Sequence, residues 1–365
     1  MTPLIAPHML ALRPYEPGKP EEEVRRELGL ESIVKLASNE NAFGATPRVT
    51  EALASGHWNP HRYPDPRTYD LRSALGVHHG IDRDEIILGN GSNEVIDFLY
   101  RVCVSGDDHS VFGRPSFSCY QIGAIAEQLP HTAVPLRDRV HWDVGALIDA
   151  VAPATRLLFV ANPNNPTGGY IGESELRRLL TEVPEEVLVV VDEAYVEFAD
   201  ADDFTPATEL RGLRERLMVL RTFSKAYGLA GVRVGYGIGP RELVADLNRL
   251  RAPFNVNTIA QRLALVALED QAHLERTVRA TIEQRESLRA ALSERGLEVA
   301  PSQANFLLVA LPRPGREVFQ ALLHEGVIVR PMNPPLEDSI RVTVGLPEEN
   351  ARFLKAFDRV LEGPA

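Results

Sequence analysis

The stretch Val187-Leu-Val-Val-Val-Asp-Glu-Ala-Tyr195 places a carboxylate directly after five apolar residues. A short continuous apolar run of this kind is typical of a strand that is buried on both faces of a parallel sheet. Asp192 would then stand at the carboxyl end of that strand, which is the edge where open α/β sheets bind ligands. Taken alone, Asp192 could equally cap a helix or a turn, so its surroundings decide between the two interpretations.

Segments of strand and helix character alternate around this stretch. The strand-like segments are 85–88, 110–112, 132–135, 156–160, 187–191, 217–220 and 232–238. The helical patterns between them are 92–104, 116–128, 143–151 and a segment that begins at 173. This alternation predicts an α/β fold with a mostly parallel sheet that is covered by helices on both faces.

The length of the chain and a change of pattern predict two domains. A chain of 365 residues is too long for one compact core. We expect a large domain over 36–258 and a small α+β domain over 259–365, which begins with one long helical period that reaches about residue 295. The proline-rich and then charged segment 1–35 is expected to form an arm with a short helix, and to pack on the small domain or on a second subunit.

Composition excludes several classes of partner. The formal charge of −12 argues against nucleic acid or an anionic membrane as the main partner, although a pocket can still be locally basic for an anionic substrate. No apolar run approaches the roughly 20 residues of a membrane-spanning helix. The two cysteines, Cys103 and Cys119, have no metal-binding or redox spacing, so no metal site is predicted and a cytoplasmic protein is expected.

Lys225 lies in the run Arg221-Thr-Phe-Ser-Lys-Ala-Tyr-Gly-Leu-Ala-Gly-Val-Arg233. The neighbouring Thr222, Ser224 and glycines fit poorly with an ordinary surface lysine. A lysine amine condenses with an aldehyde once it is partly deprotonated, and a desolvated site with nearby cations lowers its pKa. Arg233 could supply such a cation and pair with a phosphate group, and the two hydroxyls could complete a phosphate site.

Two polar loops accompany this lysine. Asn162-Pro-Asn-Asn-Pro-Thr-Gly168 follows an apolar strand, and although it is first of all a turn former, the Asn165 amide could donate to a ligand oxygen. Gly89-Asn-Gly-Ser-Asn93 joins a strand to a helix, where backbone N–H groups and the Ser92 hydroxyl could bind phosphate. An amide loop, a strand-end carboxylate and a lysine beside hydroxyls together predict an aldehyde cofactor with a phosphate tail, pyridoxal phosphate.

This cofactor gives Asp192 and Tyr195 a chemical role. A buried carboxylate that faces the ring nitrogen keeps it protonated, so that the ring can accept electrons. Tyr195 could bond the phenolic oxygen of the ring, although a packing aromatic is the simpler interpretation of that residue alone. The run Gly235-Tyr-Gly-Ile-Gly-Pro240 lacks the spacing of a dinucleotide loop, which disfavours a hydride-transfer enzyme.

The motifs around Asn162, Asp192 and Lys225 resemble those of fold-type I pyridoxal-phosphate aminotransferases. Ser38-Asn-Glu-Asn-Ala-Phe-Gly44, Arg62-Tyr-Pro-Asp65 and Ile340-Arg-Val-Thr-Val-Gly345 narrow the resemblance to the histidinol-phosphate aminotransferase family. The likeness covers nearly the whole chain, with the motifs in the expected order. It implies a large domain with a mostly parallel seven-stranded sheet and a smaller α+β domain.

The resemblance also implies roles for individual residues. Lys225, Asp192 and Tyr195 would be catalytic, with Lys225 binding the cofactor covalently and Asp192 holding the ring nitrogen. The other cofactor contacts would come from Ser92, Asn93, Phe117 (stacked on the ring), Asn165, Thr222, Ser224, Arg233 and, from the neighbouring subunit of a homodimer, Tyr63. The substrate would be bound by Tyr15, Asn39, Asn165, Arg330 and Arg341.

The reaction implied is amino transfer between L-histidinol phosphate and 2-oxoglutarate, which gives imidazole-acetol phosphate and glutamate in histidine biosynthesis. An aromatic or phenylalanine aminotransferase of the same fold is the main alternative, followed by a phosphothreonine-type decarboxylase. From a different functional class, the chain could be a cofactor-binding regulator that kept the fold without turnover. Such regulators usually carry a DNA-binding module, and nothing basic or helix-turn-helix-like precedes residue 40.

Overall fold

The computed structural model describes residues 4–12, 18–56, 58–103 and 105–362, and its largest element is a seven-stranded sheet with the order β2-β8-β7-β6-β5-β3-β4. All neighbouring strands run parallel except the two pairs made by β8. The predicted sheet is therefore confirmed. Its strands are β2 (Ile86–Gly89), β3 (His109–Arg114), β4 (His131–Pro135), β5 (Thr155–Ala161), β6 (Leu188–Asp192), β7 (Leu217–Thr222) and β8 (Gly235–Ile238).

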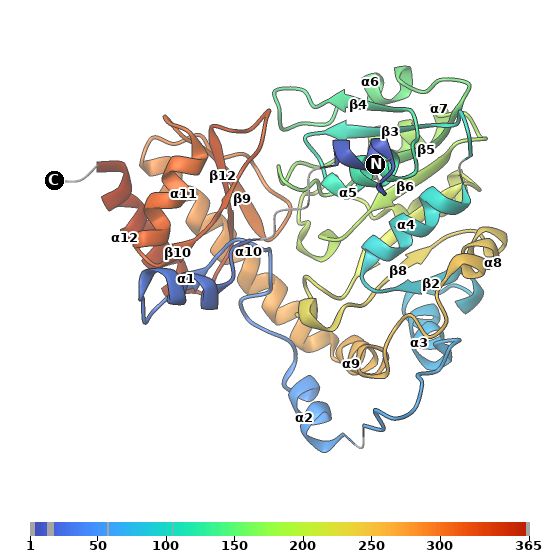
Figure 1. Cartoon of the computed structure of the whole chain (residues 1–365), viewed down its shortest axis with the longest axis horizontal. Coiled ribbons are helices and arrows are strands. Elements are labelled where there is room, and N and C mark those ends of the chain that lie inside the picture. The colour runs from blue at the N-terminus through green and yellow to red at the C-terminus, as the bar shows by residue number, and fades with distance from the viewer. Residues whose placement is uncertain (1–3, 13–17, 57, 104, 363–365) are drawn as a thin grey trace.

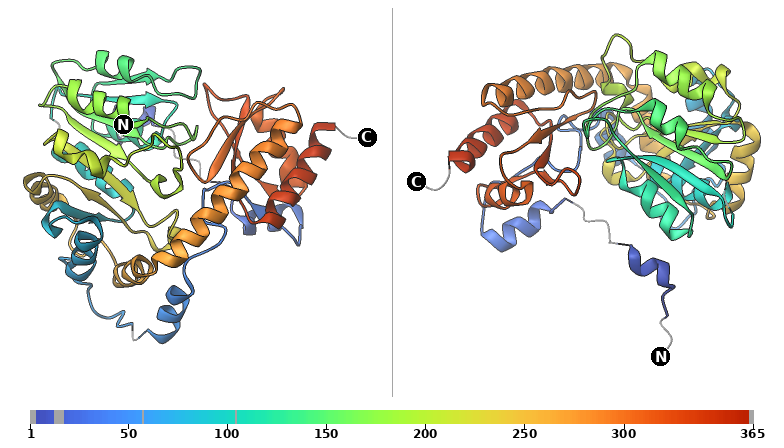
Figure 2. Two further views of the ribbon diagram at one scale, coloured as in Figure 1. Left: turned by 180° about the vertical axis from the view of Figure 1, so that it is seen from behind. Right: turned by 90° about the horizontal axis from the view of Figure 1, so that it is seen from above.

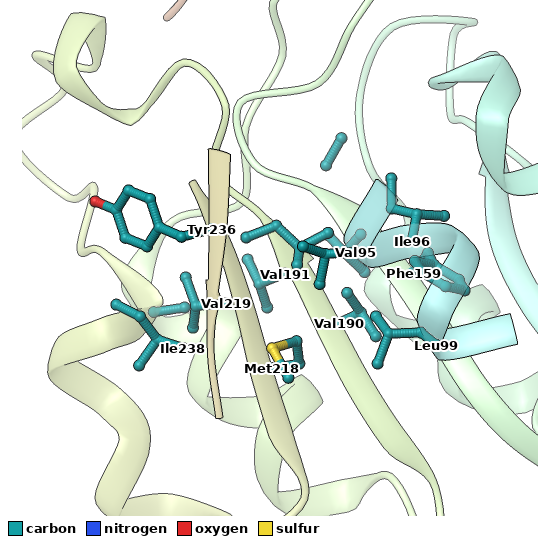
Figure 3. Packing of buried hydrophobic residues seen from close by; sticks show 14 of the residues in the cluster. Val95, Ile96, Leu99, Phe159, Val190, Val191, Met218, Val219, Tyr236 and Ile238 are labelled. Atoms are coloured by element: carbon teal, nitrogen blue, oxygen red, sulfur yellow. The ribbon is translucent and has the colours of Figure 1, made fainter. Parts of the chain in front are cut away.

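Helices cover both faces of this sheet. In Figure 1, α4 (Ser92–Val102) and α5 (Ser118–Ala126) lie in front of it, and the rear view of Figure 2 shows α7 (Glu173–Glu182) on the other side. Figure 3 shows side chains of α4 packing against those of the central strands. The other helices of this unit are α2 (Pro47–Ser55), α3 (Tyr69–His79), α6 (Val144–Asp149) and α8 (Arg241–Leu250).

The register of the central strands decides where the polar motifs lie. Ala161 at the end of β5 is paired with Asp192, and Asp192 is paired with Leu220 of β7. The loop that follows β5, the carboxylate that ends β6 and the segment that follows β7 therefore emerge at one edge of the sheet. Parallel strands bring their carboxyl ends together in this way, which is why open α/β sheets bind ligands there.

A second, smaller unit has its own sheet and core. Its antiparallel sheet has the order β11-β12-β9, and its core is a separate cluster that includes Leu307, Val342 and Phe353. The long helix α10 (Gln271–Glu294) runs from the large unit to this one in Figure 2. The elements of the small unit are β9 (Phe306–Ala310), β10 (Val327–Ile328), β11 (Arg330–Pro331), β12 (Ser339–Thr343), α11 (Gly315–His324) and α12 (Pro347–Glu362).

The N-terminal segment contacts both units. β1 (Val34–Lys35) pairs with β10 in parallel, and Val24 of α1 (Glu21–Leu28) packs in a cluster with Ile328. The short 3₁₀ helix η1 (Pro7–Ala11) lies against α5 of the large unit. The exact domain bounds, 35/36 and 258/259, stay a prediction.

Two sequence expectations differ from the structure. The single helical period over 259–295 is two helices, α9 (Thr258–Glu269) and α10 (Gln271–Glu294), because the Asp270 side chain accepts from the His273 N–H and starts a new helix. The strand expected over 232–238 begins only at Gly235, because Arg233 has a φ of 65°. Among the described residues, no helix is long and apolar enough to cross a membrane.

Candidate active site

A cavity of about 510 Å³ opens at the carboxyl edge of the large sheet, where the small unit faces it. Its walls contain most of the residues that the sequence predicts for the site. Tyr63 is not among them, and Tyr15 lies outside the described residues. The predicted residues that line the cavity are Asn39, Ser92, Asn93, Phe117, Asn165, Asp192, Tyr195, Thr222, Ser224, Lys225, Arg233, Arg330 and Arg341.

The Lys225 amine projects into this cavity. Its Nζ donates to the Ser38 carbonyl at 3.2 Å and lies 5.6 Å from the centre of the Tyr195 ring. Burial, together with the guanidinium groups of Arg341 and Arg233, lowers the pKa of the amine from 10.5 to about 7. The sequence pointed to Arg233 for this effect, but Arg341 contributes more. An amine with a pKa near 7 is available as a nucleophile and base at neutral pH.

Asp192 is buried at the end of β6 and is held by two donors. The Tyr120 hydroxyl donates to Oδ2 at 2.8 Å, and the Ala194 N–H donates to Oδ1 at 3.2 Å. Burial raises the pKa of this carboxyl to about 6, while both hydrogen bonds favour its ionised form. The carboxyl is therefore largely charged at neutral pH, as an acceptor for a protonated ring nitrogen must be.

Tyr120 is a functional candidate that the sequence reasoning missed. It is fully buried and stacks on Phe159 with ring centres 4.9 Å apart. It lies in the string Pro-Ser-Phe-Ser-Cys-Tyr, one helical turn after Phe117, and that spacing was the only signal. Its partner Asp192 is 72 residues away, so the hydrogen bond could be found only once the fold was known.

The small unit contributes Arg341 to the opposite wall. Its Nη1 donates to Asn165 Oδ1 at 2.5 Å and its Nη2 donates to the Ala37 carbonyl at 2.8 Å. Arg330 lies directly across from Arg341 in the β11–β12 pair. Two guanidinium groups at one wall form a suitable site for a carboxylate or a phosphate.

Asn39 connects this wall to Tyr195. Its Nδ2 donates to the Tyr195 hydroxyl oxygen at 2.9 Å. Asn39 has a φ of 55°, and the Thr343 hydroxyl accepts from its backbone N–H at 2.9 Å. Asn305 Nδ2 donates to the Asn39 carbonyl at 3.2 Å, so β12 and the segment before β9 hold Asn39 in place. Thr343 and Asn305 are further supporting residues that the sequence reasoning did not identify.

The donors at the far end of the cavity suit a phosphate group. α4 begins at Ser92, and its N-cap Gly91 has a φ of 76° and lies so close to Arg233 that a Cβ there would be 2.6 Å from Nη2. On the other side of this site, the Ser224 N–H donates to the Thr222 hydroxyl at 3.1 Å, and this bond holds the two hydroxyl-bearing residues in position. Helix N–H groups, hydroxyls and a guanidinium are the groups that bind phosphate dianions, so the donor set fits the phosphate tail of pyridoxal phosphate.

A buried ion pair connects the carboxyl ends of β6 and β7 next to the cavity. Arg221 Nε on β7 donates at 2.8 Å to Glu193, the residue that follows Asp192. Both side chains are almost inaccessible to solvent. Because the pair joins the ends of β6 and β7, it fixes the position of Asp192 relative to the segment that carries Lys225. The sequence reasoning assigned no role to either residue.

Tyr63 lies apart from these residues. Its side chain is 81% exposed and stacks on Phe254 with ring centres 4.4 Å apart. Within one subunit it does not reach the cavity. Its predicted role depends on a second copy of the chain.

Comparison with known proteins identifies the family. The model of the family "Aminotransferase class I and II" matches residues 31–357. The chain is 43% identical to histidinol-phosphate aminotransferase from Anaeromyxobacter sp., over 98% of this chain and 99% of that protein, and 44% identical to histidinol-phosphate aminotransferase 2 from Methylococcus capsulatus, over 99% of each. The solved structure of histidinol-phosphate aminotransferase from Sinorhizobium meliloti in complex with pyridoxal-5'-phosphate matches with a TM-score of 0.90 and 26% identity, over 99% of this chain and 98% of that one. This chain belongs to the family of class I and II aminotransferases.

Proposed function

We propose that this protein is a pyridoxal-phosphate-dependent aminotransferase that moves an amino group between L-histidinol phosphate and 2-oxoglutarate, within histidine biosynthesis. The observation that carries the proposal is the single cavity that joins the Lys225 amine, the Asp192 carboxylate and the guanidinium groups of Arg330 and Arg341. The names and the high coverage of the relatives support it. The products are imidazole-acetol phosphate and glutamate.

The residues of the cofactor site would bind different parts of the cofactor. Pyridoxal phosphate, when bound, supplies an aldehyde carbon and a ring that accepts electrons. Lys225 would bind the aldehyde, Asp192 would hold the proton on the ring nitrogen, and Asn165 and Tyr195 would contact the phenolic oxygen. Phe117 would stack on the ring. The phosphate would be held by Ser92, Asn93, Thr222, Ser224 and Arg233.

Lys225 also moves the proton of the reaction. Once the amino donor has displaced it from the cofactor, its Nζ would take the proton from the substrate carbon that bears the amino group and deliver it to the cofactor carbon. A pKa near 7 allows the same amine to act as base and then as acid at neutral pH. Tyr120 keeps the Asp192 carboxylate oriented and charged while this transfer takes place.

The wall that contains Arg330 and Arg341 must bind an anionic group of the substrate in both half-reactions. Arg341, assisted by Arg330, Asn39 and Tyr15, would bind the carboxylate of glutamate in one and the phosphate of histidinol phosphate in the other. Guanidinium groups suit this exchange because their planar fork binds either anion with two parallel hydrogen bonds. We further propose a cytoplasmic homodimer in which Tyr63 of each subunit reaches the cofactor phosphate of its neighbour, which agrees with the exposure of this side chain.

Absorbance of the purified protein tests the cofactor chemistry. Wild-type protein should be yellow, with a visible band that disappears in Lys225→Ala. A colourless wild type that stays colourless after addition of pyridoxal phosphate would show the cofactor assignment to be wrong.

A half-reaction tests the substrate. Histidinol phosphate added to the yellow holoenzyme without 2-oxoglutarate should bleach the visible band, and 2-oxoglutarate should then restore it. Phenylalanine is the matched comparison, because it carries a carboxylate in place of the phosphate ester. If phenylalanine bleaches the band much faster than histidinol phosphate, the protein is an aromatic aminotransferase instead.

A further inference from the structure

A second pocket, of about 250 Å³, adjoins the active-site cavity. The two share Phe117, Asn165, Arg330 and Arg341 as walls. One side of the second pocket comes from the end of β3 and the start of α5, and the other comes from the segment 330–336 of the small unit. Arg139 Nη1 donates to the Pro335 carbonyl at 3.0 Å, which joins the two units beside it. We call this space the annex pocket.

The annex pocket is cationic in a protein with a net charge of −12. Arg114, Arg330 and Arg341 line it, and none of its described lining residues is an aspartate or a glutamate. Arg330 and Arg341 lie directly opposite each other in antiparallel strands. Like charges in such a pair are destabilising, so an anion bound beside them would offset that cost.

Arg114 is the residue that distinguishes the annex pocket from the main cavity. It is the last residue of β3 and has an exposed side chain, and it therefore stands at the same ligand-binding edge as Asp192. Within the described ranges, neither a hydrogen bond nor an ion pair engages its guanidinium. Ser116 and Gln121 add uncharged polar side chains on the same side of the pocket.

We propose that Arg114 is a specificity-determining residue: from the annex pocket it adds a further contact to the substrate phosphate that Arg341 and Arg330 hold, and it so favours a phosphate ester over a carboxylate. The inference rests on the proposed function. In glutamate the carboxylate is bonded directly to the carbon that bears the amino group. In histidinol phosphate a CH₂–O link moves the phosphorus two bonds further away, so the phosphate reaches past Arg341 toward Arg114. A phosphate dianion carries one negative charge more than a carboxylate, and it can therefore pair with an additional guanidinium group, that of Arg114.

Half-reaction kinetics of the Arg114→Gln holoenzyme test this assignment. We expect kcat/KM for histidinol phosphate to fall about tenfold, mainly through KM, while kcat/KM for glutamate changes less than about twofold. A loss of this size is at the low end for a hydrogen bond to a charged group, because the Arg114 side chain is exposed to solvent. Arg114→Lys keeps the charge without the fork and should recover part of the loss.

Arg101→Gln is the matched control. Arg101 lies on the exposed side of α4, so this variant removes the same charge from a place outside either pocket. It should change neither substrate constant. If Arg114→Gln weakens both amino donors equally, or weakens neither, the annex pocket does not select phosphate and the inference is wrong.

Inorganic phosphate is an independent probe, because the cofactor already fills the other phosphate site of the holoenzyme. It should inhibit wild type in competition with the amino donor, and roughly tenfold more weakly in Arg114→Gln. Should wild type fail to use histidinol phosphate at all, the proposed function is wrong, and inhibition of the glutamate reaction then decides about the annex pocket alone. Equal inhibition of wild type and Arg114→Gln would refute the anion site in either case.

Discussion

At the level of single residues, the chemistry of the Lys225 amine depends on pH near neutrality. Its pKa is lowered to about 7, so the neutral amine that attacks an aldehyde is already abundant above pH 7, whereas an ordinary lysine would need a pH near 10.5. The rate constant for capture of pyridoxal phosphate by the apoenzyme should therefore rise with pH and level off, with a midpoint near 7. Stopped-flow absorbance at low cofactor concentration measures it.

Two controls separate the lysine from other titrating groups. Pyridoxal has no phosphate to titrate and should give the same midpoint. Arg341→Gln removes the cation that lowers the Lys225 pKa most, so its midpoint should move to higher pH. A wild-type midpoint above about 9 would contradict the lowered pKa.

Removal of the Tyr120 hydroxyl should weaken cofactor binding. In Tyr120→Phe the buried Asp192 carboxylate loses its nearest donor, at a cost of about 1.5–3 kcal/mol for a hydrogen bond to a charged group. The pKa of Asp192 should rise further above 6, so the cofactor affinity should fall as pH decreases and should do so at a higher pH than in wild type. Absorbance titration of the apoenzyme at several pH values measures this.

Tyr100→Phe is the matched variant for that experiment. The Tyr100 hydroxyl donates at 2.7 Å to the backbone carbonyl of Tyr120. The variant therefore also removes a buried tyrosine hydroxyl, but one that bonds to Tyr120 and not to the Asp192 carboxylate. It should leave the pH dependence of cofactor affinity unchanged. If both variants shift it equally, Tyr120 acts through packing and not through its hydrogen bond.

The sequence could predict the residues that emerge at strand ends but not the contacts between them. Asp192 and Asn165 each follow an apolar run, and the carboxyl ends of parallel strands must meet, so their proximity could be inferred. The Tyr120 hydroxyl, by contrast, meets Asp192 only because α5 packs on the sheet at one particular rotation. Arg114 ends a strand too, but no motif marks it.

At the level of elements, α10 holds the segment that follows Tyr195. Arg285 of α10 has 1% of its side chain exposed, and it donates to the Phe198 carbonyl at 3.0 Å and to Asp200 at 2.7 Å. Arg285→Met keeps the apolar stem but removes these donors. It should lower the free energy of unfolding by about 2 kcal/mol, less than for a fully buried pair because Asp200 can turn to water. Urea denaturation measures the change.

Arg289→Met on the same helix serves as the control. The Arg289 side chain is 43% exposed and pairs with Glu286 at 2.8 Å. A surface pair of this kind contributes little, so the variant should cost less than about 0.5 kcal/mol. If the two variants cost the same, α10 does not hold the segment through Arg285.

The break between α9 and α10 shows what helical periodicity cannot predict. The apolar pattern continues across Asp270, so the sequence favoured one helix. Asp270 instead accepts hydrogen bonds from the His273 N–H and from the Thr46 hydroxyl, and the second of these partners is 224 residues away. A capping aspartate is a local signal, but whether it ends a helix depends on such distant partners.

At the level of the whole molecule, the active site lies between two units whose cores are separate clusters. Sequence pattern predicted both units, because each has its own alternation of strands and helices. It could not predict the pocket shared by them, because Arg114 and Arg330 are 216 residues apart (330 − 114) and meet only after the units dock. The overall charge of −12 gave no sign of this local cationic site.

The proposed homodimer makes a prediction about how two defective enzymes combine. Each site would take Lys225 from one subunit and Tyr63 from the other, so a hybrid of Lys225→Ala and Tyr63→Ala chains has one intact site and one site with both defects. Refolding the two inactive variants together should restore about a quarter of wild-type activity, since about half of the dimers are hybrids and each has one working site. The assay is run at limiting pyridoxal phosphate, where loss of Tyr63 matters most. Each variant refolded alone is the control, and no recovery on mixing would mean that Tyr63, exposed as it is in one subunit, does not serve its neighbour.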